Sequence, residues 1–274
     1  MSTFQSQPRR VMTVPRFVKR KRIGPPLVML TAYDLPTARA AEAGGVDALL
    51  VGDSLGNVLL GERDTLTVTL DQMIHHARAV GRARQSALLI VDMPWMTYHV
   101  SIEETLRNAA RIIRETSADA VKLEGGANRV PAIRALLDAE IPVMGHLGLT
   151  PQSVLRMGGY KVQGRSEAAV ERLVEDAQRI EQAGVFGLVL EGVPSAVAAR
   201  ITGTVAVPTI GIGAGDHCDG QVLVFHDLLG MSPEPGPKFV RRYAEIHDAQ
   251  VDAIRRWAGD VRQRTFPGDA ESYG

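Results

Sequence analysis

Cysteine is nearly absent from this chain of 274 residues, in which Cys218 is the single thiol. One cysteine excludes an intrachain disulfide framework and is typical of a protein kept in a reducing compartment. Apolar runs long enough to cross a bilayer, which takes about 20 residues, are also missing. The first ten residues, MSTFQSQPRR, lack the apolar core of a secretion signal. We therefore expect a cytoplasmic protein with no membrane partner.

An excess of charge of either sign is lacking as well, because 31 basic residues balance 31 acidic ones. A net charge of zero argues against a general nucleic-acid binder or a membrane-surface protein. The one basic run, RFVKRKR at residues 16–22, is short, and we interpret it as part of a solvated first helix.

Short apolar runs are abundant, and five of them close with an acidic residue: VMLTAYD, ALLVGDS, ALLIVDMP, AVKLEGG and FGLVLEGVP. Eight such runs, most followed by an amphipathic helix, predict a parallel sheet or barrel. The length is near the roughly 250 residues of a (β/α)8 TIM barrel. We expect one barrel domain over 1–274, with a flexible N-terminal segment and a frayed C-terminal tail. A doubly wound sheet is disfavoured, because no Rossmann glycine pattern follows the first strand.

The predicted strands are 27–31, 47–52, 87–91, 119–123, 141–145, 186–190, 206–210 and 221–225. A lead helix is expected at 13–22 and a C-terminal helix at 237–258. The two longest loops, 147–165 and 211–220, follow strands and fall at the barrel end that carries function.

Two carboxylates, Asp53 and Asp92, end neighbouring predicted strands. The carboxyl ends of barrel strands meet at one mouth, so these side chains and Glu124 should converge. Such crowding is costly unless a cation or a proton offsets the repulsion. Mg²⁺ suits it, because this ion takes one or two carboxylates and keeps water or substrate oxygens. Either aspartate alone would be interpreted as a turn cap, but together with Glu124 they favour a magnesium site.

Lys122 lies two residues before Glu124, so both side chains should point to the same side of a strand. A buried lysine is rare unless it is paired or functional. A structural ion pair and Schiff-base chemistry both remain open. The neighbouring carboxylates favour an electrostatic role for the ammonium group.

Glu191 closes the sixth strand in an apolar setting, where burial and neighbouring carboxylates would make it a stronger base. A metal ligand or a helix cap is the alternative. His146 ends the fifth strand and is a candidate substrate contact. The glycines of IGIGAG, residues 210–215, could cradle a phosphate or simply form a tight turn.

In this order, MLTAYD, LLVGDSLGNVLLG, DMPWMTY, VKLEGG, MGHLGLTPQSV, GGYKVQGR and IGIGAGDHCDGQVLVFHDLLG form a highly specific set. Over roughly residues 13–260 the chain resembles the ketopantoate hydroxymethyltransferase family. That resemblance implies a barrel of the phosphoenolpyruvate/pyruvate type. It also implies a cytoplasmic homo-oligomer, often a decamer of two pentamer rings.

The resemblance also implies residue roles, carried over position by position. It places metal binding on Asp53, Asp92 and Glu124. It assigns contacts with a 2-oxo acid to Asp53, Ser54, Asp92 and Lys122, proton abstraction to Glu191, and a place on the active-site rim to His146. No short motif identifies the residues that contact a folate.

The implied reaction moves a one-carbon unit from 5,10-methylenetetrahydrofolate to 3-methyl-2-oxobutanoate, giving 2-dehydropantoate and tetrahydrofolate, with Mg²⁺ as cofactor. Two other readings remain. A Mg²⁺-dependent carbon–carbon lyase or phosphonate-forming mutase on the same barrel would also chelate a 2-oxo acid. A non-catalytic barrel would be expected to lack the acidic rim that this chain has.

Overall fold

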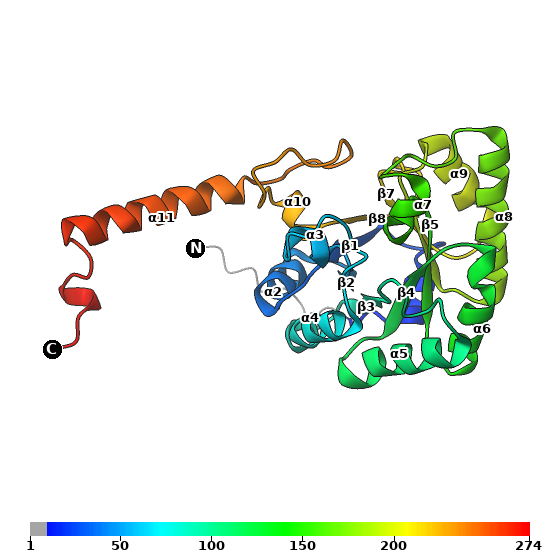
Figure 1. Cartoon of the computed structure of the whole chain (residues 1–274), viewed down its shortest axis with the longest axis horizontal. Coiled ribbons are helices and arrows are strands. Elements are labelled where there is room, and N and C mark those ends of the chain that lie inside the picture. The colour runs from blue at the N-terminus through cyan, green and yellow to red at the C-terminus, as the bar shows by residue number, and fades with distance from the viewer. Residues whose placement is uncertain (1–9) are drawn as a thin grey trace. The chain divides into compact units, whose positions relative to one another are not determined.

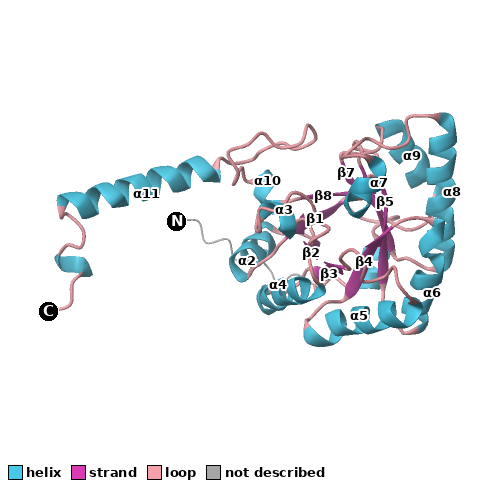
Figure 2. Cartoon of the chain, in the orientation of Figure 1, coloured by secondary structure: helices cyan, strands magenta, loops and turns pink. Residues whose placement is uncertain are grey.

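The chain folds as a closed barrel of eight parallel strands in sequential order, with the eighth strand pairing with the first (Figures 1 and 2). The structure, a computed structural model, describes residues 10–274. The strands are β1 (Leu27–Thr31), β2 (Ala48–Val51), β3 (Leu88–Asp92), β4 (Ala120–Glu124), β5 (Val143–Gly148), β6 (Gly187–Glu191), β7 (Thr209–Ile212) and β8 (Gly220–Leu223). The predicted TIM barrel is therefore confirmed.

Helices alternate with the strands and surround the barrel (Figure 2). The longer ones are α2 (Leu35–Gly44), α4 (Leu70–Ala83), α5 (Ile102–Glu115), α6 (Val130–Asp138), α8 (Glu167–Ala183) and α9 (Ser195–Thr204). Shorter ones are α1 (Val14–Lys19), α3 (Leu55–Val58), α7 (Val154–Met157) and the 3₁₀ turns η1 (Ala127–Arg129) and η2 (Pro151–Ser153). The longer helices begin where the sequence places oxygen-bearing caps: the side chains of Asp34, Thr69, Ser101 and Ser166 each accept a backbone N–H of the first turn.

The barrel strands are buried almost throughout, as parallel strands covered on both faces should be. Side chains from all eight strands and from α1 form one apolar cluster. Phe17 of α1 is fully buried there and meets Phe186 edge-to-face, with ring centroids 5.6 Å apart. Helix α1 is thereby fixed to the barrel core.

Several element boundaries differ from the prediction: α1 ends at Lys19 and not at 22, and β7 spans Thr209–Ile212 and not 206–210. Two further differences concern the site and the C-terminal helix. Strand β5 runs from Val143 to Gly148, which puts His146 inside the strand and not at its end. Helix α11 spans Ile246–Gln263, so the expectation of a helix from 237 was wrong at its start. Backbone N–H groups of Tyr243 and Ile246 donate to carbonyls of residues 228 and 229, and these bonds hold that stretch in a non-helical turn.

Contacts divide the chain into two units, one ending at Val224 and one spanning Phe225–Gly274. The second unit holds α10 (Phe225–Leu228), α11 and the 3₁₀ turn η3 (Asp269–Glu271). A single domain over 1–274 therefore stays a prediction, and the expected flexible N-terminal segment lies mostly outside the described residues. Between residues 10 and 274, no helix is both long and apolar enough to cross a membrane.

Candidate active site

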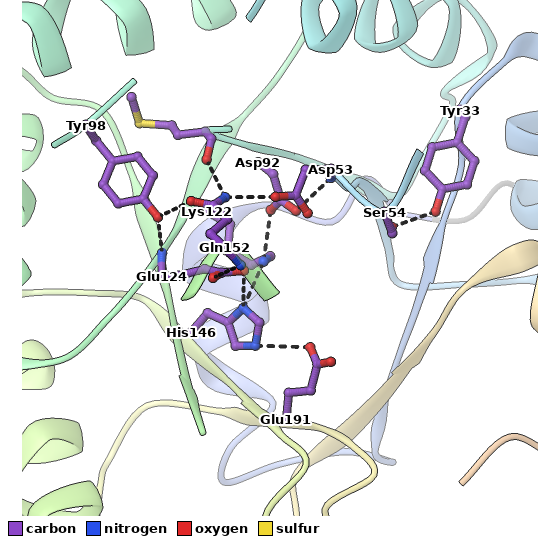
Figure 3. Close-up of polar contacts among 11 residues, drawn as sticks. Tyr33, Asp53, Ser54, Asp92, Tyr98, Lys122, Glu124, His146, Gln152 and Glu191 are labelled. Carbon is purple, nitrogen blue, oxygen red and sulfur yellow. Dashed lines mark hydrogen bonds and ion pairs between the residues drawn. The ribbon is translucent and has the colours of Figure 1, made fainter. Parts of the chain in front are cut away.

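Five ionisable side chains converge at the carboxyl ends of the strands (Figure 3). Asp92, Glu124 and Glu191 are the last residues of β3, β4 and β6. Asp53 follows β2 by two residues, and His146 lies in β5. The convergence predicted from the sequence is therefore present, and it places these groups on the face where TIM-barrel enzymes carry their chemistry.

Asp53 and Asp92 form a crowded, buried pair. Only 4 % and 3 % of their surfaces are exposed, and the Asp53 backbone N–H donates to Asp92 Oδ2 at 3.2 Å. Burial, then the charges of Asp92 and Glu124, raise the pKa of Asp53. Burial also raises the pKa of Asp92, although Lys122 partly opposes the shift. Two carboxylates held this close are poised to share a cation or a proton.

Lys122 supplies a positive charge beside this pair. Its Nζ lies 3.0 Å from Asp92 Oδ1 and 3.2 Å from His146 Nδ1, and Lys122 and Asp92 are register partners in adjacent strands. Burial alone would lower the pKa of Lys122, but the surrounding carboxylates outweigh it and raise that pKa. A lysine held in its charged form is a poor Schiff-base nucleophile, so the geometry favours the electrostatic role.

His146 lies between two carboxylates. Its Nδ1 is 3.4 Å from Glu124 Oε1, and its Nε2 is 3.2 Å from Glu191 Oε2. Burial and the nearby Lys122 lower the pKa of His146, but hydrogen bonding to Glu124 and Glu191 raises it to about 9. The His146 ring therefore lies between the carboxylates that end β4 and β6, and Lys122 Nζ also faces its Nδ1.

Gln152 connects most of the site, and sequence reasoning missed it. Its Nε2 donates to Asp53 Oδ2 at 2.8 Å and to the Met93 carbonyl at 3.0 Å. Its Oε1 accepts from the Tyr98 hydroxyl at 2.6 Å, and its backbone N–H donates to Glu124 Oε2 at 3.0 Å. It lies in η2, within the loop already singled out as functional, but no periodicity or charge in TPQSV marks it.

A metal ion fits part of the residue set predicted for it. Among residues 10–274, no group of three or more His, Cys, Asp or Glu side chains is arranged to hold a metal ion. Both Glu124 oxygens already face protein groups, the Gln152 N–H and the His146 ring. Both Asp92 oxygens face protein groups as well, Lys122 Nζ and the Asp53 N–H. Mg²⁺ usually binds one or two carboxylates and keeps waters or substrate oxygens, so its binding by Asp53 and Asp92 stays a prediction. Direct ligation by Glu124 stays a prediction.

Ser54 lies at the start of α3, directly after Asp53. Its Oγ is 2.8 Å from the Tyr33 hydroxyl, and the Tyr33 carbonyl is 2.6 Å from His76 Nδ1. These contacts fix the loop that presents Asp53 (Figure 3). The predicted role of Ser54 as a substrate contact remains untested.

The glycine-rich turn after β7 is explained by close packing. Gly213 and Gly215 have φ of 59° and 80°, which disfavour other residues. A Cβ on Gly215 would lie 2.2 Å from Ser195 Oγ at the start of α9. Cys218 in the same loop is buried, which raises the pKa of its thiol and disfavours a nucleophilic role.

The closed (β/α)8 barrel and the buried ionisable side chains at the carboxyl ends of its strands together are the arrangement typical of TIM-barrel enzymes. Residues 11–269 match the ketopantoate hydroxymethyltransferase family, and the chain belongs to that family.

Two curated relatives illustrate the match. The 3-methyl-2-oxobutanoate hydroxymethyltransferase of Pelobacter propionicus is 54% identical over 98% of this chain and 99% of its own length. That of Oleidesulfovibrio alaskensis is 56% identical over 90% of this chain and 86% of its own.

Solved structures extend the likeness at the level of the fold. A 2,3-dimethylmalate lyase of the PEP mutase/isocitrate lyase superfamily superposes with a TM-score of 0.61 at 20% identity, covering 97% of this chain and 93% of that one. A phosphonopyruvate hydrolase in complex with oxalate and Mg²⁺ gives 0.61 at 14% identity, covering 96% and 92%. At such identities these neighbours show the barrel type and not the reaction.

Proposed function

We propose that the chain transfers a one-carbon unit from 5,10-methylenetetrahydrofolate to 3-methyl-2-oxobutanoate. With water supplying the hydroxyl oxygen, the products are 2-dehydropantoate and tetrahydrofolate, in the synthesis of pantothenate. The names of relatives more than 50% identical over nearly the whole chain support this assignment. The arrangement of the buried site supports a mechanism for it.

The 2-oxo acid would bind beside Asp53 and Asp92, which would hold Mg²⁺. When bound there, Mg²⁺ would supply Lewis-acid polarisation of the substrate carbonyl. Burial raises the pKa of both aspartates and the Glu124 carboxylate adds to the shift, so a cation beside them would favour their ionised forms. Lys122, 3.0 Å from Asp92, adds a fixed positive charge that stabilises the enolate oxygen as charge develops.

Glu191 is the general base that removes the C3 proton. Its side chain is 17% exposed, whereas those of Glu124 and His146 are 4% and 3% exposed. Of these three contacting groups, Glu191 is therefore the most accessible to an incoming substrate. The His146 ring, with Nε2 3.2 Å from Glu191 Oε2, orients the Glu191 carboxylate. This pair is the single observation that carries the mechanism, because it places a base at the mouth beside the proposed oxo-acid site.

Once the proton is removed, the C3 carbanion of the enolate forms the new bond to the folate's methylene carbon. One of the two carbon–nitrogen bonds of the methylene bridge opens to give the iminium form that C3 attacks. The second breaks when water adds the hydroxyl group, and both nitrogens leave protonated, as tetrahydrofolate. A lyase or a mutase on the same barrel would also chelate a 2-oxo acid, but neither would transfer a one-carbon unit from a folate to it. Membership of the hydroxymethyltransferase family favours the transfer reaction over both.

Proton NMR of 3-methyl-2-oxobutanoate in D₂O tests the proposal in two stages. With Mg²⁺ and the protein, the C3 proton signal should disappear, and EDTA should prevent the loss. Adding methylenetetrahydrofolate should then give 2-dehydropantoate. If neither exchange nor product occurs with any divalent metal, the proposed function is wrong.

A cytoplasmic homodecamer remains a prediction, which rests on the family resemblance. Light scattering of the purified full chain at several concentrations would test it: a mass near ten times the chain's 29.6 kDa supports the decamer.

A further inference from the structure

The basic run near the N-terminus lines a cavity far from the chemistry described above. The cavity has a volume of about 430 Å³ and is lined by Arg10, Met12, Arg16, Lys19, Arg20, Ile23, Val46, Asp47 and Ser86. We call it the basal pocket. The expectation that residues 16–22 form only a solvated helix is thus incomplete, because several of these side chains border a shared hollow.

The basal pocket lies at the end of the barrel opposite the mouth. Arg10 to Ile23 precede β1, Val46 and Asp47 precede β2, and Ser86 precedes β3. In a parallel barrel, residues that precede strands lie at the amino ends, whereas Asp92, Glu124 and Glu191 lie at the carboxyl ends. The pocket is therefore a separate site.

Charge in the pocket is strongly one-sided. Arg10, Arg16, Lys19 and Arg20 contribute four cationic side chains, against the single carboxylate of Asp47. That carboxylate is already engaged, since Oδ1 pairs with Arg20 Nη1 at 3.4 Å and Oδ2 accepts the Val28 N–H at 2.9 Å.

Two of the cations have no partner of their own. Within the part of the chain that the structure describes, the side chains of Arg10 and Lys19 make no ion pair and no hydrogen bond. Arg16 donates to the Val11 carbonyl and Arg20 to the Pro25 carbonyl at 2.7 Å, which orders both guanidinium groups at the rim. Ordered guanidinium groups beside free cations are the usual recognition chemistry for phosphate.

The volume of the basal pocket and its apolar lining indicate what the ligand carries besides a phosphate group. A volume of about 430 Å³ falls within the roughly 300–1,000 Å³ of small-molecule sites and far exceeds a lone phosphate. Met12, Ile23 and Val46 give the pocket an apolar wall. We propose that the basal pocket binds a small phosphate ester, with the phosphate on the basic side chains and the organic portion against this wall. This inference does not rest on the proposed catalytic function.

Calorimetric titration of the full chain with adenosine 5′-diphosphate, in buffer with EDTA to exclude metal chelation, tests the proposal. Saturable binding of one ligand per chain is expected. Inorganic phosphate should compete, whereas adenosine should not, because the phosphate carries the recognition. Absence of saturable binding, or equal competition by adenosine, would overturn the proposal.

Variants locate the binding. The double variant Arg10→Gln/Lys19→Gln should weaken the affinity at least about tenfold, because it removes both unpaired cations. Arg22→Gln is the matched control, since Arg22 is exposed beside the same helix but does not line the pocket. It should change the affinity less than twofold. Unchanged binding in the double variant, or an equal loss in the control, would show that the pocket is not the site. Circular dichroism should show that both variants are folded.

Discussion

The His146 ring nitrogen Nε2 lies 3.2 Å from Glu191 Oε2, and this contact joins a side chain of β5 to the last residue of β6. The opposite nitrogen, Nδ1, lies 3.4 Å from Glu124 Oε1. Lys122 Nζ lies 3.2 Å from Nδ1, and an ammonium group can only donate, so Nδ1 is the nitrogen suited to accept and Nε2 the one suited to donate to Glu191. His146 can therefore orient Glu191, and its predicted contact with the substrate stays a prediction.

Replacing Glu191 by Gln should stop exchange of the C3 proton while leaving oxo-acid binding nearly intact. The amide has almost the same shape but cannot accept the proton. The exchange rate in D₂O should fall at least about 100-fold. Glu167→Gln, an exposed glutamate at the start of α8, is the control and should exchange normally. Full exchange activity in Glu191→Gln would remove Glu191 from the mechanism.

Replacing Asp92 by Asn should weaken Mg²⁺-dependent binding of 3-methyl-2-oxobutanoate at least about tenfold. The change removes the charge of one of the two carboxylates proposed to hold the ion and turns the 3.0 Å ion pair with Lys122 into a contact with a neutral amide. Calorimetric titration with and without EDTA measures the effect. Asp216→Asn, on a side chain 94% exposed, should bind like the unchanged protein. Undiminished Mg²⁺ dependence in Asp92→Asn would exclude Asp92 from a metal site.

Replacing Gln152 by Leu should weaken Mg²⁺ binding about 10- to 100-fold, although Gln152 itself carries no charge. The amide donates to Asp53 Oδ2 at 2.8 Å and so fixes the orientation of that carboxylate. Gln163→Leu is a matched control in the same loop, because the Gln163 side chain donates to the nearby Lys161 carbonyl and, among residues 10–274, to no carboxylate of the site. Titration of Mg²⁺ into each purified variant compares them. Equal affinities would mean that Asp53 needs no such support.

Sequence patterns were sufficient for the barrel because its strands are buried on both faces, so each appears as an unbroken apolar run. The convergence of Asp92, Glu124 and Glu191 then follows from topology, since each ends a parallel strand. The contacts of Gln152 could not be predicted from sequence patterns or topology. Its neutral side chain lies in a 3₁₀ turn, and its importance depends on partners up to 99 residues away in the chain.

The basal pocket and the start of α11 could not be predicted from the sequence, and the physical reason is the same for both. Residues 16–22 look like a solvated basic helix unless one knows that Val46 and Ser86 lie across from them. Residues 237–245 look helical unless one knows that the Tyr243 N–H donates to the Leu228 carbonyl and the Arg242 side chain to the Ser232 carbonyl. In both cases the structure depends on contacts between residues distant along the chain, whereas the strands could be predicted from local sequence pattern.

Acid should destabilise the protein partly through His99. Burial, then the nearby Arg129 guanidinium, lowers the pKa of His99 to about 4, against a usual value of 6.5. Between these values the unfolded chain binds a proton at His99 that the folded chain does not. The free energy of unfolding therefore falls as the pH is lowered from 6.5 toward 4, and this contribution is fully present above 6.5.

His99→Gln removes that proton uptake, so its stability should fall less steeply over the same pH range. Urea denaturation at several pH values between 4 and 7 would compare the two proteins, with other titrating groups common to both. His217→Gln, on a side chain 60% exposed, should follow the unchanged protein. If His99→Gln shows the same pH slope as the unchanged protein, His99 is not among the groups that couple protonation to unfolding. The acid sensitivity would then belong to other groups, with the buried Asp53 and Asp92 excluded on sign, since carboxyl groups with a raised pKa favour the folded state at low pH.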